Sequence, residues 1–116
     1  MNNVIIKVNN SEEYKKTLSI LGGLGVIWDN GEIIDVKDGE LDSNDLTYMI
    51  YESSSIYGGK EYKENETLIC LIVEHNKLFW EFLDNMIKID NMTENNFSFK
   101  NYEVYTFRDF EKMYSL

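Results

Sequence analysis

The single histidine of the chain is the first side chain to test for catalysis. His75 stands between an apolar run at residues 68–73 and a second apolar stretch, where the end of a strand could present a general base. A lone histidine in a turn is more often a surface or capping residue. We therefore rank a small hydrolase that uses His75 as the least favoured function, and we expect a protein that is not an enzyme.

Metal ligands and nucleophiles are equally scarce. One histidine and one cysteine, Cys70, exclude a His-based metal cluster and an internal disulfide. A calcium-binding loop with Gly39 at its sixth position would place Ile34 and Val36 at the first and third ligand positions, where carboxylates are required. The serines at 53–55 lack the G-x-S-x-G frame of an activated nucleophile. We expect no metal and no cofactor, and we interpret the crowded carboxylates as a solvated face.

Acidic residues are concentrated in one third of the chain. Residues 29–66 hold eleven of the 21 acidic residues and only three of the 11 basic ones, so they carry most of the net charge of −10. That charge, with Arg108 as the single arginine, excludes direct nucleic-acid binding, because phosphate recognition needs a cationic footprint. Acidity often confers only solubility, but here aromatic side chains, the usual anchors of interfaces, lie in the same segment. The predicted partner-binding residues are Asp29, Glu32, Asp35, Asp38, Glu40, Asp42, Asp45, Tyr48, Tyr51 and Tyr57.

The leading interpretation is a small acidic cytoplasmic inhibitor that occludes the basic surface of a nuclease or another nucleic-acid-binding protein. Toxin-immunity proteins and phage anti-defence proteins share this size and charge, which is a likeness of composition and not of motif. The alternative is a small-molecule binder, with a homo-oligomer also left open, that holds its ligand among the three tyrosines beside Gly58 and Gly59. An excess of carboxylates counts against an anionic ligand there unless Lys60 and Lys63 cluster at the site.

Neither a leader nor a membrane segment is apparent in the sequence. The first ten residues lack a basic n-region and a small-residue cleavage site, and no apolar run approaches the length of about 18 residues that a spanning helix needs. We therefore expect a cytoplasmic protein with no membrane association.

The elements that position these residues begin with a strand over Val4–Val8. Asn10 and Glu13 have the spacing of a capping box, so a helix is predicted from about Ser11, with an apolar stripe. The glycines at 22–25 follow this helix and precede a strand, which favours a helix stop over a phosphate-binding loop. Asn30-Gly31 between apolar runs then predicts a type I′ hairpin.

The centre of the chain is a strand over residues 68–73 followed by a helix over residues 77–89 with Asn76 as its N-cap. The apolar residues of that helix would cover an arc of about 200°, so we expect Trp80 and Phe82 to be buried. A further short helix is predicted near residues 42–53, and an extended piece near Tyr62.

The last third is predicted to hold strands at 97–99 and 104–107, a turn at Lys100-Asn101, and a closing helix from Arg108 with Phe110 and Met113 inward. Strands and helices in this order predict an α+β fold. We expect one α+β domain over residues 1–116, with a mainly antiparallel sheet and helices packed on one face.

Overall fold

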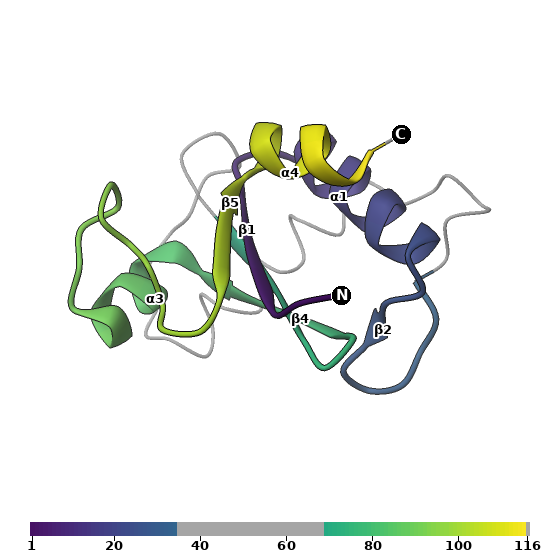
Figure 1. Ribbon diagram of the computed structural model, residues 1–116, viewed down its shortest axis with the longest axis horizontal. Helices are drawn as coiled ribbons and strands as arrows, with labels where there is room; N and C mark the ends of the chain where they lie inside the picture. Colours follow the sequence, from purple (N-terminus) through teal and green to yellow (C-terminus); the bar gives the residue numbers. More distant parts are fainter. Residues whose placement is uncertain (35–68, 116) are drawn as a thin grey trace.

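The computed structural model describes residues 1–34 and 69–115, and these ranges form a five-stranded sheet with three helices (Figure 1). The predicted helix near 42–53 and the extended piece near Tyr62 lie outside them. In chain order the elements are β1 (Val4–Val8), α1 (Ser11–Gly23), β2 (Ile27–Trp28), β3 (Ile69–Glu74), β4 (Lys77–Phe82), α3 (Leu83–Asp90), β5 (Glu103–Thr106) and α4 (Phe107–Tyr114).

The predicted α+β class is confirmed, and the sheet is mixed. Its strand order is β2-β4-β3-β1-β5. The three central strands β4, β3 and β1 pair antiparallel, whereas β2 and β5 pair parallel to their neighbours β4 and β1. The predicted antiparallel pairing is therefore found among the three central strands and not at the two edges of the sheet. The parallel edge strands arise because α1 and α3 intervene and bring the chain back in the same direction.

Apolar side chains lie on both faces of the sheet. Alternate residues of β1 and β3 enter two separate clusters, because successive side chains of a strand point to opposite faces. One cluster, the α1/α4 core, contains Val4, Ile6, Val8, Ile69, Leu71 and Val73 together with Leu18, Leu21 and Phe110. The other, the α3 core, contains Ile5, Cys70, Ile72, Leu83, Met86 and Phe97.

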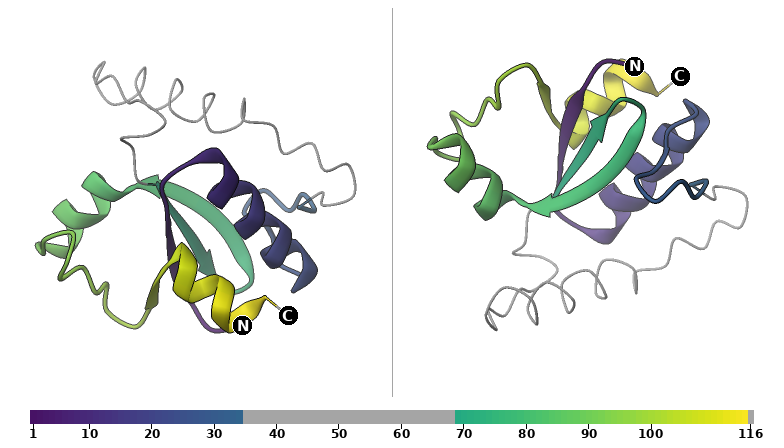
Figure 2. Two further views of the ribbon diagram at one scale, coloured as in Figure 1. Left: turned by 90° about the horizontal axis from the view of Figure 1, so that it is seen from above. Right: turned by 90° about the horizontal axis from the view of Figure 1, so that it is seen from below.

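The helices divide between these two faces. Helices α1 and α4 lie side by side, and α3 lies away from them at the far end of β4 (Figures 1 and 2). The prediction that the helices pack on one face therefore holds for α1 and α4 but not for α3. The α3 helix is needed opposite them, because a strand with apolar side chains on both faces must be covered on both.

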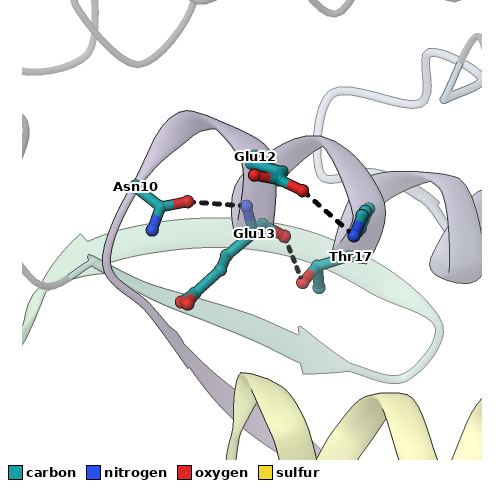
Figure 3. Close-up of polar contacts among 5 residues, drawn as sticks. Asn10, Glu12, Glu13 and Thr17 are labelled. Carbon is teal, nitrogen blue, oxygen red and sulfur yellow. Dashed lines mark hydrogen bonds and ion pairs between the residues drawn. The ribbon is translucent and has the colours of Figure 1, made fainter.

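Local side-chain chemistry starts α1 where the sequence predicts. Asn10 is the N-cap, and its Oδ1 accepts a hydrogen bond from the Glu13 N–H at 2.9 Å (Figure 3). The Glu13 carboxylate in turn accepts a hydrogen bond from the Asn9 N–H at 3.0 Å, so Asn10 and Glu13 each satisfy one backbone amide at the start of the helix. Thr17, fully buried below this turn, donates its hydroxyl to the Glu13 carbonyl at 2.7 Å. The predicted cap at Asn10 and the helix start at Ser11 are confirmed, while the reciprocal bond of the capping box goes to the Asn9 N–H in place of the Asn10 N–H.

The predicted glycine stop of α1 is also confirmed. Gly25 has a φ of +84°, and its N–H donates to the Gly22 carbonyl at 3.1 Å. The next amide, that of Val26, donates to the Leu21 carbonyl at 3.1 Å. These two bonds form a Schellman motif, and Val26 and Leu21 are both buried in the α1/α4 core. The end of α1 therefore also directs the chain into the α1/α4 core.

The helix predicted over residues 77–89 is wrong in its first half. Residues Lys77–Phe82 are strand β4, joined to β3 by a two-residue turn at His75 and Asn76, and helix α3 follows only from Leu83. Both turn residues have positive φ, 51° and 66°, as a type I′ hairpin requires. Asn76 is thus a turn residue and not an N-cap.

Burial explains why a strand is preferred over a helix there. In β4, Leu78 and Phe82 enter the α1/α4 core while Phe79 packs on the α3 core. A strand between two packed layers can bury apolar residues in both directions, and its backbone bonds to β3 at the same time. Trp80 is half-buried and makes an edge-to-face contact with Phe82, with ring centroids 5.3 Å apart.

The connection after α3 is a loop, so the strand predicted at 97–99 is wrong. The Asp90 carboxylate accepts hydrogen bonds from the N–H groups of Ser98 and Phe99, at 2.9 and 3.2 Å. These backbone amides therefore donate to a side chain and not to the carbonyl groups of a neighbouring strand. The turn predicted at Lys100-Asn101 is confirmed by the Tyr102 N–H, which donates to the Phe99 carbonyl at 3.1 Å.

The closing helix α4 begins one residue before the predicted Arg108. Phe110 is fully buried as expected, but Met113 is 63% exposed, so its inward placement is wrong. The buried face is instead formed by Phe107 and Phe110, with Tyr114 stacked on Phe110 at a centroid distance of 4.9 Å. Spacings of three and four residues keep these rings on one side of the helix, and Met113 falls beside them.

Truncation of Phe82 should show how much the α1/α4 core contributes to the free energy of unfolding. Phe82 is 1% exposed, so we expect Phe82→Ala to lower the free energy of unfolding by about 3–5 kcal/mol in urea titrations. Ile89→Ala is the control, since Ile89 is 65% exposed and its loss should change stability by less than about 0.5 kcal/mol. Equal effects of the two substitutions would contradict the burial of β4.

Candidate functional site

Two of the ten predicted partner-binding residues, Asp29 and Glu32, belong to the part of the chain that the structure describes, and both are exposed. They lie on the turn that follows β2. The other eight fall outside the described residues: Asp35, Asp38, Glu40, Asp42, Asp45, Tyr48, Tyr51 and Tyr57. We call residues 27–34 the acidic hairpin.

Backbone hydrogen bonds close the acidic hairpin tightly. The Gly31 N–H donates to the Trp28 carbonyl, and the Trp28 N–H donates to the Glu32 carbonyl, both at 2.9 Å. The Asn30 side-chain oxygen accepts from the Glu32 N–H at 3.0 Å. An antiparallel bridge between Ile27 and Ile33 completes the turn. Three internal hydrogen bonds therefore hold the segment in one conformation.

The predicted turn at Asn30-Gly31 is confirmed, but its type differs from the prediction. Gly31 has a φ of +91°, whereas Asn30 is not among the residues with positive φ in the described ranges. A type I′ turn requires positive φ at both positions. The observed form is a three-residue loop that ends on a glycine in the left-handed region, which is the next most common hairpin connection.

The base of the acidic hairpin is attached to the sheet. The Ile27 N–H donates to the Asn76 carbonyl at 3.2 Å, and the Asp29 N–H donates to the Leu78 carbonyl at 2.9 Å. Ile34 is 2% exposed and belongs to the α1/α4 core. The hairpin is thus held at both ends, by β4 and by the core.

The tip of the hairpin combines charge with an exposed aliphatic side chain. Ile33 is 80% exposed, the highest value among the large apolar side chains in the described ranges. It directly follows the exposed Glu32, and Asp29 lies across the turn. Sequence reasoning missed Ile33 as a surface residue. The signal was the Ile33-Ile34 doublet, because two neighbouring strand residues cannot both face the core.

His75 lacks the surroundings of a catalytic base. Its side chain is 84% exposed, and its Nε2 lies 4.0 Å from a carboxylate oxygen of Glu74. The His75 N–H donates to the Asn3 side chain at 3.2 Å, which supports the turn. The described residues therefore leave this imidazole open to water, whereas a general base usually works at a site that excludes it. Within residues 1–34 and 69–115, no group of three or more His, Cys, Asp or Glu side chains could hold a metal ion.

Cys70 is buried in the α3 core, with an exposed fraction of 0%. Burial raises the pKa of its thiol to about 12, since the thiolate would lose its hydration there. A thiol of this kind is protonated at neutral pH and packs as a small apolar group. Cys70 therefore has a structural role.

No protein-family model, curated protein or solved structure matches this chain. The helices in the described ranges are all too short or too polar to cross a membrane. Any function must therefore be inferred from the chemistry of the chain itself, and the acidic hairpin is the part of the predicted interface that the structure describes.

Replacing Gly31 should destabilise the acidic hairpin. Gly31→Val forces a β-branched residue to a φ of +91°, although no atom lies within 4 Å of the added Cβ. We expect a loss of about 1–3 kcal/mol in unfolding free energy, from backbone strain alone.

The matched control for Gly31 is Gly23, which also has nothing within 4 Å of an added Cβ but lies inside α1. Gly23→Ala should leave stability unchanged or raise it by up to about 1 kcal/mol, because alanine is the better helix former. A harmless Gly31→Val, measured by urea denaturation, would show that the turn is not formed as described.

Proposed function

We propose that this protein is an acidic binding protein that inhibits a nuclease or another nucleic-acid-handling protein by covering its basic surface. The observation that carries the proposal is the acidic hairpin, a closed turn that displays Asp29, Glu32 and the 80%-exposed Ile33 together. Carboxylates there would meet lysines and arginines that otherwise contact phosphates, and Ile33 would add an apolar contact among them.

Rigidity of the hairpin favours binding. Three internal hydrogen bonds and two bonds to neighbouring segments fix the turn before any partner arrives. Association costs less when the contacting segment is already ordered, because fewer backbone and side-chain conformations are lost. A preformed turn is therefore a suitable platform for the first contacts with a partner.

The charge of the chain supports the same proposal. Residues 29–34 of the acidic hairpin are the first residues of the segment 29–66, which holds eleven acidic and three basic residues. A net negative charge of this kind attracts a basic partner and speeds encounter, and the effect weakens as salt shortens the Debye length. The proposal thus includes a kinetic signature, namely an association rate that falls steeply with ionic strength.

The other functions that the sequence leaves open gain less support. The small-molecule pocket would use Tyr48, Tyr51 and Tyr57 beside Gly58 and Gly59, which all lie outside the described residues. A hydrolase would depend on His75, which is exposed to water on a hairpin turn. We therefore propose the inhibitory binding role and no enzymatic one.

Charge reversal on the acidic hairpin tests this proposal. Asp29→Lys combined with Glu32→Lys removes two attractive charges and adds two repulsive ones at exposed positions, so the variant should fold normally. Its association with a nuclease or other basic protein that the unaltered chain inhibits should slow at least about tenfold, equivalent to about 1.4 kcal/mol. Stopped-flow binding at several salt concentrations measures the effect, which should be largest at low salt.

A matched double variant, Glu12→Lys with Glu94→Lys, changes the net charge equally from exposed positions outside the hairpin. Glu12 is in the first turn of α1, and Glu94 is in the connection between α3 and β5. We expect this control to slow association far less. Equal slowing by both variants would mean that only total charge matters, and unchanged binding by the hairpin variant would place the interface elsewhere.

A further inference from the structure

Apart from the acidic hairpin, the described residues form a hollow of about 310 Å³ near the ends of β1 and β5, with two basic and two acidic side chains in its lining. Its walls come from parts of the chain that are far apart in sequence: Lys7, Glu13, Glu94, Thr106, Phe107 and Arg108. Two of these side chains are cationic, and Arg108 is the only arginine of the protein. A hollow of this size is at the lower end of the range for small-molecule sites.

The pairing of β1 and β5 brings the two cations together. Lys7 and Thr106 are register partners on these parallel strands, so their side chains project on the same face of the sheet. Arg108 follows Thr106 by two residues, at the start of α4. Lys7 is half-buried and lines the hollow, and a lysine in such a position commonly packs its aliphatic stem and keeps its ammonium group in water. The sheet therefore positions Lys7, and the start of α4 directly after β5 positions Arg108.

Neither cation is neutralised by a close ion pair in the described ranges. Lys16, by contrast, pairs with Glu12 at 3.1 Å. No carboxylate of residues 1–34 or 69–115 lies within 4.0 Å of the charged nitrogens of Lys7 or Arg108. Of the two acids on the wall of the hollow, Glu13 has an oxygen occupied by the Asn9 N–H at 3.0 Å.

The hydroxyl of Thr106 adds a hydrogen-bond donor. Its Oγ1 accepts from the Asp109 N–H at 3.2 Å, which fixes the oxygen and leaves the O–H proton to donate elsewhere. Phe107 supplies an apolar wall and is 9% exposed. A fixed hydroxyl, an ammonium and a guanidinium around one space form a donor set for the oxygens of an anion.

We propose that this hollow binds a small oxyanion, the phosphate or carboxylate group of a metabolite, between Lys7 and Arg108. The Arg108 guanidinium donates to two oxygens at once, and Lys7 contributes a point charge from the strand. Glu13 and Glu94 at the wall accept hydrogen bonds from hydroxyl or amino groups of the same ligand. The site is independent of the acidic hairpin, and it would be a ligand site on a binding protein.

Titration with inorganic phosphate, followed by the amide resonances in ¹H–¹⁵N NMR spectra, tests the site. Ionic strength is held constant with sodium chloride, and sodium acetate is titrated in parallel to separate phosphate from carboxylate recognition. We expect saturable shifts of the amides of Lys7, Thr106 and Arg108 with at least one of the two anions. Shifts that stay linear to the end of both titrations, or that scatter over the whole surface, would overturn the proposal.

Variants decide whether the two cations hold the anion. Arg108→Gln removes an exposed charge without disturbing the core, and it should weaken binding about tenfold, as the loss of a charge-assisted hydrogen bond does. Lys7→Met should do the same while keeping the packed stem. Lys88→Met and Lys100→Gln are the matched controls on exposed positions elsewhere, and they should leave the affinity unchanged. Equal weakening by all four variants would indicate general charge screening and would reject the site.

Discussion

The rest of the structure depends on the antiparallel pair of β1 and β3, which has no polar face along most of its length. Val4, Ile5 and Ile6 are all fully buried, and the β3 residues that pair with them are buried. Such a pair can be stable only if apolar layers cover both of its sides, because each uncovered face would leave several large aliphatic groups in water. Helices α1 and α4 cover one side, and α3 with the loop around Phe97 covers the other. The division of the helices between two faces and the strand at Lys77–Phe82 both follow from this requirement.

Because the core is satisfied by these layers, the chemistry of the molecule lies at the ends and edges of the sheet. Backbone hydrogen bonds attach the acidic hairpin to β4, and the hairpin displays carboxylates. The hollow beside β1 and β5 is lined by Lys7 and Arg108, among other residues. Both are built on rigid elements, which is what precise recognition requires. The two sites differ in composition, because the acidic hairpin displays carboxylates alone, whereas the hollow combines Lys7 and Arg108 with the carboxylates of Glu13 and Glu94.

Features decided by local chemistry were predictable from the sequence. The Asn10 cap, the glycine stop at Gly25 and the turn at Gly31 each depend on one side chain or one backbone angle, and all three are present. The strand over Lys77–Phe82 was not predictable in this way, because its apolar residues fit a wide helical arc and a doubly packed strand equally well. The deciding feature was the turn at His75 and Asn76, which has positive φ at both residues without a glycine, so the sequence lacks the Asn-Gly or Asp-Gly pair that marks most turns of this type. For the candidate sites, Asp29 and Glu32 were found through charge density, whereas Lys7 and Arg108 meet only through the parallel pairing of β1 with β5.

The covering of the sheet on both faces is tested most directly by the reactivity of Cys70, the one thiol of the chain, which lies in the α3 core. Labelling by a thiol reagent is followed across a urea series, and the free energy of opening is compared with that of global unfolding from circular dichroism. Since the thiol is fully buried with a pKa raised to about 12, it should react only when the whole domain unfolds, and the two free energies should agree. Rapid labelling without urea, at a rate close to that of the unfolded chain, would show that the α3 face is open and would contradict the two-sided core.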